Sequence, residues 1–219
     1  MEIYNSEQEQ VEALRKWWRE NGTALILGVV LGLGGLFGYR GWVDYRDGQA
    51  EQAADVYQQA LVAARAGDLA GVRAAREQLL ADYASTPYPV LAALLEAKGL
   101  LEAGDAAAAR TQLQWVVEQA PTPELADVAR LRLASLALAE RQPDAALAAL
   151  ESLQQGGSYR AQVAELRGDA ALLRGDQAAA RTAYQEALAA GGENRAVVRM
   201  KLDDLGGPEV APQALEEKP

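Results

Sequence analysis

An uninterrupted apolar segment near the N-terminus constrains this chain more than any other feature of its sequence. Nineteen consecutive residues, from Asn21 to Tyr39, carry no charge. As a helix rising about 1.5 Å per residue they extend roughly 28 Å, close to the ~30 Å hydrocarbon core of a bilayer. Basic and aromatic side chains, which suit the headgroup layer, flank the segment: Arg15, Lys16, Trp17, Trp18 and Arg19 before it, and Arg40, Trp42 and Tyr45 after it. The pattern predicts a transmembrane anchor over residues 23–42.

Two other interpretations of this segment fit the sequence less well. A buried core helix of a soluble protein would need other apolar elements around it, but everything after Arg40 is amphipathic and rich in charge. A cleaved signal peptide has an apolar core of about 7–15 residues and an Ala-x-Ala-like cleavage site. Here the apolar run is longer, and glycines mixed with Leu36, Phe37 and Tyr39 stand where the small residues should be. We therefore expect a retained anchor.

The flanking charges and the glycines of the segment suggest how the anchor is oriented and packed. Three basic residues precede it closely and two, Arg40 and Arg46, follow it, which favours a cytoplasmic N-terminus and a translocated C-terminal part. Gly28, Gly32 and Gly35 fall on one helical face, where small residues allow another membrane helix to approach closely. Glycine is also generally common in membrane helices, so this face is a candidate site of helix packing.

Composition excludes several classes of function. The chain has 21 Lys and Arg residues against 31 Asp and Glu, a formal charge of −10, which disfavours binding to nucleic acid. It has no Cys and no His, so thiol nucleophiles, imidazole bases and imidazole metal ligands are absent. Carboxylates recur at Asp68, Asp105 and Asp176, and we interpret them as helix caps rather than as a glycosidase acid pair. The sequence predicts no catalytic site, no metal site, no cofactor and no enzymatic activity.

A repeating pattern organises the rest of the chain. Gly-Asp pairs occur at 67–68, 104–105 and 175–176, and Arg141-Gln-Pro-Asp144 fills the missing place, giving steps of 37, 37 and 34 residues. This period is typical of tetratricopeptide-like helical hairpins. Small residues recur where the two helices of a hairpin must cross closely: Ala97, Ala134 and Gly168 in the first helix, and Ala109, Ala146 and Ala180 in the second.

The predicted fold class is all-α, a single N-terminal transmembrane helix followed by a tetratricopeptide-like helical-hairpin solenoid. We expect a short cytoplasmic segment over 1–22, the anchor over 23–42, a translocated repeat domain over 43–205 and a flexible tail over 206–219. The first helix should continue from the membrane to about Ala66. The other predicted helices are Leu69–Tyr83, Pro89–Ala103, Ala106–Gln119, Pro123–Arg141, Asp144–Gln154, Tyr159–Arg174, Gln177–Ala190 and a capping helix over Glu193–Leu205.

Arrays of helical hairpins commonly present a groove lined by the first helix of each pair. The repeat register places nine residues in this predicted protein-binding groove: Leu91, Leu94, Lys98, Val128, Leu131, Ser135, Gln162, Glu165 and Asp169. Their change from apolar to acidic would suit an extended or helical polypeptide with a basic end. The alternative is that several of these leucines belong to the core between repeats.

The N-terminus resembles the YfgM family. The residues that carry the resemblance are Met1-Glu-Ile-Tyr4, Glu9-Gln-Val-Glu-Ala-Leu14, Trp17-Trp18 and Glu20-Asn-Gly22, together with the Gly-rich span and the Ala-rich repeats that follow. The stretch Ala-Glu-Leu-Arg-Gly-Asp from Ala164 to Asp169 is also similar to the family. The resemblance covers residues 1–205, and we find no match for the proline-containing tail after Gly206.

The resemblance implies an ancillary subunit of the SecYEG translocon, with one inner-membrane span, a cytoplasmic N-terminus and a periplasmic repeat domain. It also implies association with SecYEG and the periplasmic chaperone PpiD, and a part in passing translocated polypeptides to folding factors. The expected partners are therefore these proteins, translocating chains and membrane lipid, and no nucleic acid. A self-associating envelope scaffold, not tied to the translocon, is the alternative function.

Overall fold

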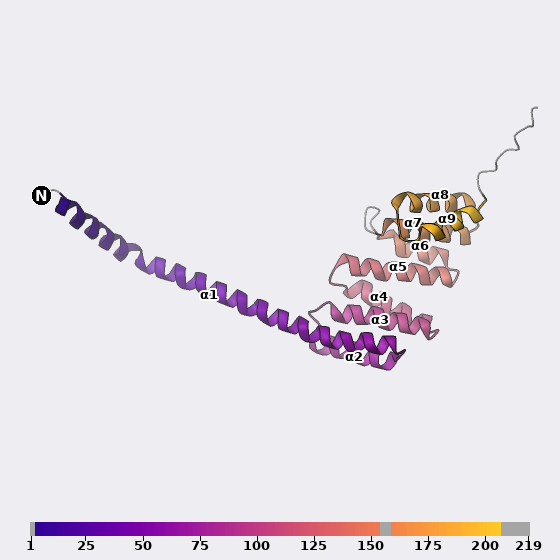
Figure 1. The fold of residues 1–219 in the computed structure, drawn as a ribbon, viewed down its shortest axis with the longest axis horizontal. Helices are drawn as coiled ribbons and strands as arrows, with labels where there is room; N and C mark the ends of the chain where they lie inside the picture. The colour runs from indigo at the N-terminus through magenta and orange to yellow at the C-terminus, as the bar shows by residue number, and fades with distance from the viewer. Residues whose placement is uncertain (1–2, 154–158, 207–219) are drawn as a thin grey trace, which may run out of the picture. The chain divides into compact units, whose positions relative to one another are not determined.

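A computed structural model describes residues 3–153 and 159–206, and the secondary-structure elements in these ranges are nine helices (Figure 1). They are α1 (Ile3–Arg65), α2 (Leu69–Asp82), α3 (Tyr88–Glu102), α4 (Ala106–Gln119), α5 (Pro123–Ala139), α6 (Pro143–Glu151), α7 (Arg160–Leu173), α8 (Gln177–Ala190) and α9 (Arg195–Asp204). The all-α prediction is confirmed for the described residues. The predicted tail lies outside them, apart from Gly206.

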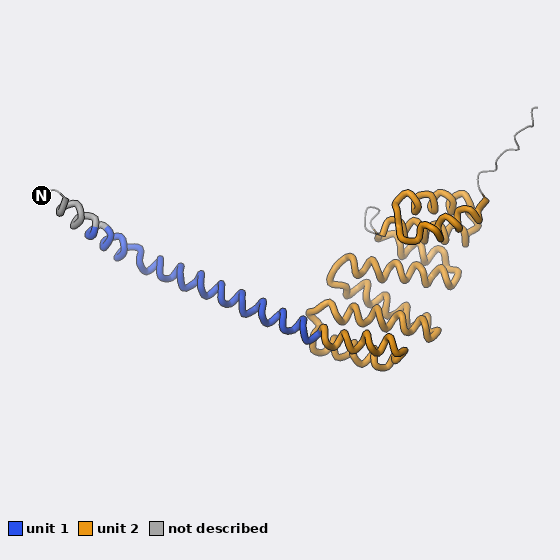
Figure 2. The backbone as a smooth tube through the Cα atoms, viewed as in Figure 1, with its two compact units in different colours: residues 1–53 blue, residues 54–219 orange. Residues whose placement is uncertain are grey.

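The chain divides into two compact units, residues 1–53 and residues 54–219 (Figure 2). The first contains most of α1, and the second contains the last turns of α1 and the helices α2–α9. Residues 43–53, predicted to belong to the repeat domain, belong to the first unit. The predicted domain boundaries stay predictions.

In the first unit, the apolar stretch of α1 is almost wholly exposed. Leu31 and Phe37 expose 66% and 67% of their surface, and no other element of this unit covers them. Among the described residues, α1 is the one helix long and apolar enough to cross a membrane. An apolar surface of this size is stable in lipid but not in water, because the apolar side chains would otherwise stay hydrated.

The second unit is built from hairpins joined by nearly identical turns. The side chains of Asp68, Asp105 and Asp176 accept hydrogen bonds from the backbone N–H groups three residues later, at 2.9, 3.0 and 2.9 Å. The carboxylates thereby cap α2, α4 and α8, as the sequence predicts. The glycine before each Asp has a positive φ of 73–82°, and Arg141 takes the same place before α6 with a φ of 60°.

The small residues of the repeat lie where helices cross. Ala109, Ala146 and Ala180 are fully buried at the start of the second helices, and Ala97 and Ala134 are buried in the first helices. In the last hairpin Gly168 of α7 faces Tyr184 of α8, and a Cβ atom at Gly168 would overlap the tyrosine ring. A larger side chain at this place would force α7 and α8 apart.

Each helix from α2 to α8 packs against the next one in the chain, and α5 also contacts α7. The core is therefore a series of clusters rather than one centre. One cluster surrounds Leu113 and Val116, a second surrounds Leu150 and Val163, and a third surrounds Tyr184 and Val198. In such an array each hairpin buries its apolar surface against its neighbours.

Candidate protein-binding surface

The nine residues predicted to line a groove lie at different depths in the structure. Leu94 and Leu131 are buried, with 7% and 3% of their surface exposed, and belong to separate core clusters. Both leucines therefore fit the alternative interpretation, in which they belong to the core between repeats. Leu91 and Val128 are half-buried, whereas Lys98, Ser135 and Gln162 are exposed. The exposed and half-buried members still form a candidate surface along the first helices α3, α5 and α7.

The acidic end of the predicted groove is already paired with a cation of the same chain. The Nζ atom of Lys201 in α9 lies 2.8 Å from Oε1 of Glu165 and 2.8 Å from each carboxylate oxygen of Asp169. The hydroxyl of Tyr184 also donates to Asp169 at 2.7 Å. Glu165 is buried, with 8% of its surface exposed. A basic partner would have to displace Lys201 in order to use these carboxylates.

Burial and neighbouring charges shift the pKa values of Lys201 and Tyr184 in this cluster. Burial alone lowers the pKa of Lys201, but the hydrogen bonds from Lys201 to Asp169 and Glu165 outweigh it, so the pKa lies above its ordinary value. Burial raises the pKa of the Tyr184 phenol, and the hydrogen bond with Asp169 raises it further. Lys201 is therefore held as a cation and Tyr184 as a neutral donor.

Sequence reasoning missed three residues on the same face of the first helices. Tyr57 of α1 lies 37 residues before Leu94 and so occupies the register place of Leu94 and Leu131 in the first hairpin. Its ring lies 5.5 Å, centroid to centroid, from the ring of Tyr88 in α3. The guanidinium of Arg132, next to Leu131 in α5, donates to the backbone carbonyl of Leu94 at 3.3 Å. Extending the repeat register upstream by one unit would have found Tyr57.

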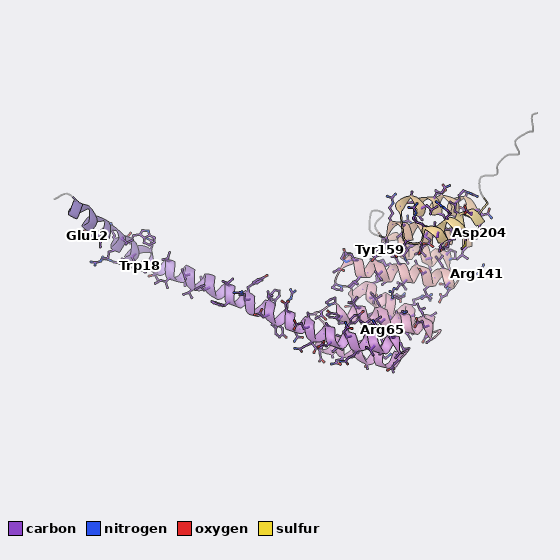
Figure 3. The ribbon with its side chains drawn as sticks, viewed as in Figure 1. Glu12, Trp18, Arg65, Arg141, Tyr159 and Asp204 are labelled. Carbon is purple, nitrogen blue, oxygen red and sulfur yellow. The ribbon has the colours of Figure 1, made fainter. Side chains whose placement is uncertain are left out.

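A cavity of about 450 Å³ lies between the last turns of α1, the start of α2 and the second half of α3. Its apolar lining includes Leu61, Leu69, Val72 and Leu95, and three charged residues also line it: Arg65, Lys98 and Glu102. Arg65 marks the C-terminal end of α1 in Figure 3. The cavity is large enough for one or two apolar side chains of a partner.

The predicted helix-packing face of the anchor is open in the structure. A Cβ atom built on Gly28, Gly32 or Gly35 would meet no other atom within 4 Å. The backbone of α1 is thus accessible along this face to another helix. The packing itself stays a prediction.

No group of three or more acidic residues among the described residues is arranged to hold a metal ion. The chemistry that the surface offers is apolar contact, aromatic contact and ion pairing. These are the interactions by which proteins bind other polypeptides.

The fold and this surface define a class, the tetratricopeptide-like interaction proteins. The sequence model of the tetratricopeptide repeat-like domain family matches residues 15–207. The chain is 38% identical over 185 residues to a protein of Escherichia coli (strain K12) named ancillary SecYEG translocon subunit, covering 84% of this chain and 88% of that relative. A Haemophilus influenzae protein of the same name is 33% identical over 204 residues, covering 92% of this chain and 99% of the relative. No solved structure matches the chain significantly.

The chain therefore belongs to the YfgM family of ancillary SecYEG translocon subunits, whose repeats are tetratricopeptide-like. The resemblance seen in the N-terminal residues is confirmed.

Proposed function

We propose that this protein is a non-enzymatic, single-pass inner-membrane protein that binds the Sec translocon and presents its repeats to periplasmic partners. The observation that carries the proposal is the 38% identity, over most of both chains, with a relative named as a translocon subunit. The exposed apolar stretch of α1 supports the anchor, because a helix of this length and composition suits a bilayer.

The orientation follows from the flanking charges. Arg15, Lys16 and Arg19 precede the apolar stretch, and the positive-inside rule then keeps the short N-terminal segment in the cytoplasm. The repeats are exported to the periplasm. There they receive translocated polypeptides together with the chaperone PpiD, the partner that family membership suggests.

The direct test is purification of the tagged full-length protein in a mild detergent, followed by mass spectrometry of the proteins that co-purify. We expect SecY, SecE, SecG and a periplasmic chaperone to be enriched over an untagged control. A tagged anchor of unrelated sequence, fused to residues 43–219, serves as a matched control for the span. Recovery of self-copies alone would contradict the proposal.

The same experiment tests the second candidate function, a self-associating envelope scaffold. The open face at Gly28, Gly32 and Gly35 favours it, because a second copy of α1 could approach closely there. In that case Gly32→Leu would remove self-copies from the purified material. If translocon subunits remain after this change, the scaffold function is not the main one.

A further inference from the structure

On the first-helix face of α3 and α5, the charge of Arg132 has no carboxylate partner among the described residues, although the protein as a whole is acidic. Glu165 and Asp169 are both paired with Lys201. Arg132 is exposed, and among the described residues it lies within ion-pair distance of no carboxylate; its hydrogen bond is to the backbone carbonyl of Leu94. Lys98 pairs with Glu102 at 3.5 Å, but both side chains are about two-thirds exposed, so water weakens this pair.

The guanidinium of Arg132 lies against α3, where it donates to the carbonyl of Leu94, and its charge acts on the phenol of Tyr57 in α1. Tyr57 and Tyr88, both half-buried, are in ring contact at 5.5 Å. Burial raises the pKa of Tyr57, and the positive charge of Arg132 opposes this rise, which places that charge within electrostatic reach of the phenol. Three consecutive first helices thus each contribute one polar side chain to the surroundings of the Tyr57 phenol: Tyr57 itself from α1, Tyr88 from α3 and Arg132 from α5.

An apolar cavity lies one helical turn along α1 from Tyr57. Leu61, one helical turn after Tyr57 on α1, lines the cavity of about 450 Å³ together with Leu69 and Leu95. Arg65, Lys98 and Glu102 line it as well. Arg132 donates to the carbonyl of Leu94, the residue before Leu95 of the lining, so the residues that flank an apolar side chain seated here come near both Lys98 and Arg132.

From this arrangement we infer that the first three hairpins bind a polypeptide segment in which carboxylates flank an apolar anchor residue. The anchor fills the cavity beside Leu61, and a carboxylate pairs with the guanidinium of Arg132. The inference rests on the proposed role in protein binding and adds the chemistry of the bound segment. The bound segment would be acidic, whereas Glu165 and Asp169 led us to expect a partner with a basic end.

The test measures peptide binding to the full-length protein in a non-ionic detergent by fluorescence anisotropy. The probe is a labelled nonapeptide with a central leucine flanked on each side by two glutamates. Matched peptides carry glutamine or lysine in place of glutamate. We expect the acidic peptide to bind roughly tenfold more tightly than the glutamine peptide, since charge-assisted hydrogen bonds contribute about that factor, and to weaken with added salt.

Two pairs of variants locate the site. Arg132→Gln should remove the roughly tenfold preference for the acidic peptide, whereas Arg199→Gln, an exposed arginine on α9, changes the net charge equally and should leave the preference intact. Ala64→Phe places a ring in the cavity and should weaken all leucine peptides, whereas Ala107→Phe, at an exposed site on α4, should not. Circular dichroism and thermal melting verify that each variant is folded.

The outcomes separate this inference from the proposed function. Tighter binding of the lysine peptide, equal binding of all three peptides, or equal effects of Arg132→Gln and Arg199→Gln would overturn the inference. Co-purification with translocon subunits could still succeed in that case. Loss of co-purification with intact preference for the acidic peptide would contradict the translocon role and leave the binding site standing.

Discussion

The Nε atom of Arg76 in α2 lies 2.6 Å from Oε2 of Glu96 in α3, with only 1% of the Glu96 side chain exposed. This contact is a pairing of charges rather than an aligned hydrogen bond. Arg73, also in α2, donates from its Nε to the other carboxylate oxygen at 2.9 Å. The Arg76 guanidinium lies 5.7 Å from the ring centroid of Trp115 in α4. One buried carboxylate thus connects the first hairpin to the second.

Replacing Glu96 with alanine should destabilise the repeat unit strongly. The change leaves the largely buried Arg76, with 15% of its side chain exposed, without its counter-charge, and breaking a buried pair in this way costs about 3–5 kcal/mol. Urea denaturation followed by circular dichroism measures the loss. Glu102→Ala, which breaks the exposed pair with Lys98, is the control and should cost under about 1 kcal/mol. Equal losses would contradict a structural role for the buried pair.

Replacing Arg141 with glycine should stabilise the protein. Arg141 has a φ of 60° where the other repeat turns have glycine, and a residue with a Cβ atom in this conformation is strained by about 1–2 kcal/mol. Glycine relieves the strain but gives the unfolded chain more freedom, so the net gain should be about 0.5–1 kcal/mol. Arg160→Gly, in the first turn of α7, is the opposite control and should destabilise. A loss of stability in Arg141→Gly would show that the arginine side chain has a role of its own.

The hairpins could be predicted because their signals are local. Asp105 caps α4 and Gly104 ends the preceding turn, so each predicted boundary in this hairpin falls within one residue of the observed one. Even the equivalence of Arg141 with the glycines was visible in the spacing, and its positive φ confirms it. Periodicity and turn residues act over a few positions, and a single sequence displays them.

The binding surface could be predicted only in part, because depth and pairing depend on contacts far apart in the chain. The register placed Leu94 and Leu131 on the first-helix face but could not show that the next hairpin covers them. It also could not show that Lys201, 36 residues after Glu165, pairs with both carboxylates of the acidic end. The sequence predicted an acidic end for the binding surface, but its carboxylates are paired within the chain, and the accessible charge on α5 is that of Arg132.

Alkaline pH should release α9 from α7. The pKa of Lys201 is raised in the folded protein, so the stabilisation from its pairs is fully present below its ordinary value of 10.5 and is lost as pH rises through the raised value. The pKa of Tyr184 is raised from 10.0, which gives a loss in the same direction. Thermal melting at increasing pH measures the loss. Lys201→Met should be less stable near neutrality and should show a shallower decline above pH 10.5, whereas Lys98→Met should follow the wild type. Parallel curves for Lys201→Met and the wild type would contradict this account.

The absence of cysteine allows a clean test of orientation. A single introduced cysteine becomes the only thiol in the chain, and Glu12 in the N-terminal part of α1 and Gln114 in α4 are exposed positions for it. In spheroplasts treated with a membrane-impermeant maleimide, we expect Gln114→Cys to react at once and Glu12→Cys to react only after detergent is added. The wild type serves as the unreactive control. The reverse pattern would contradict the positive-inside orientation, because the three basic residues before the span would then lie on the translocated side. Reaction of both cysteines without detergent would mean that the apolar stretch of α1 does not separate two compartments.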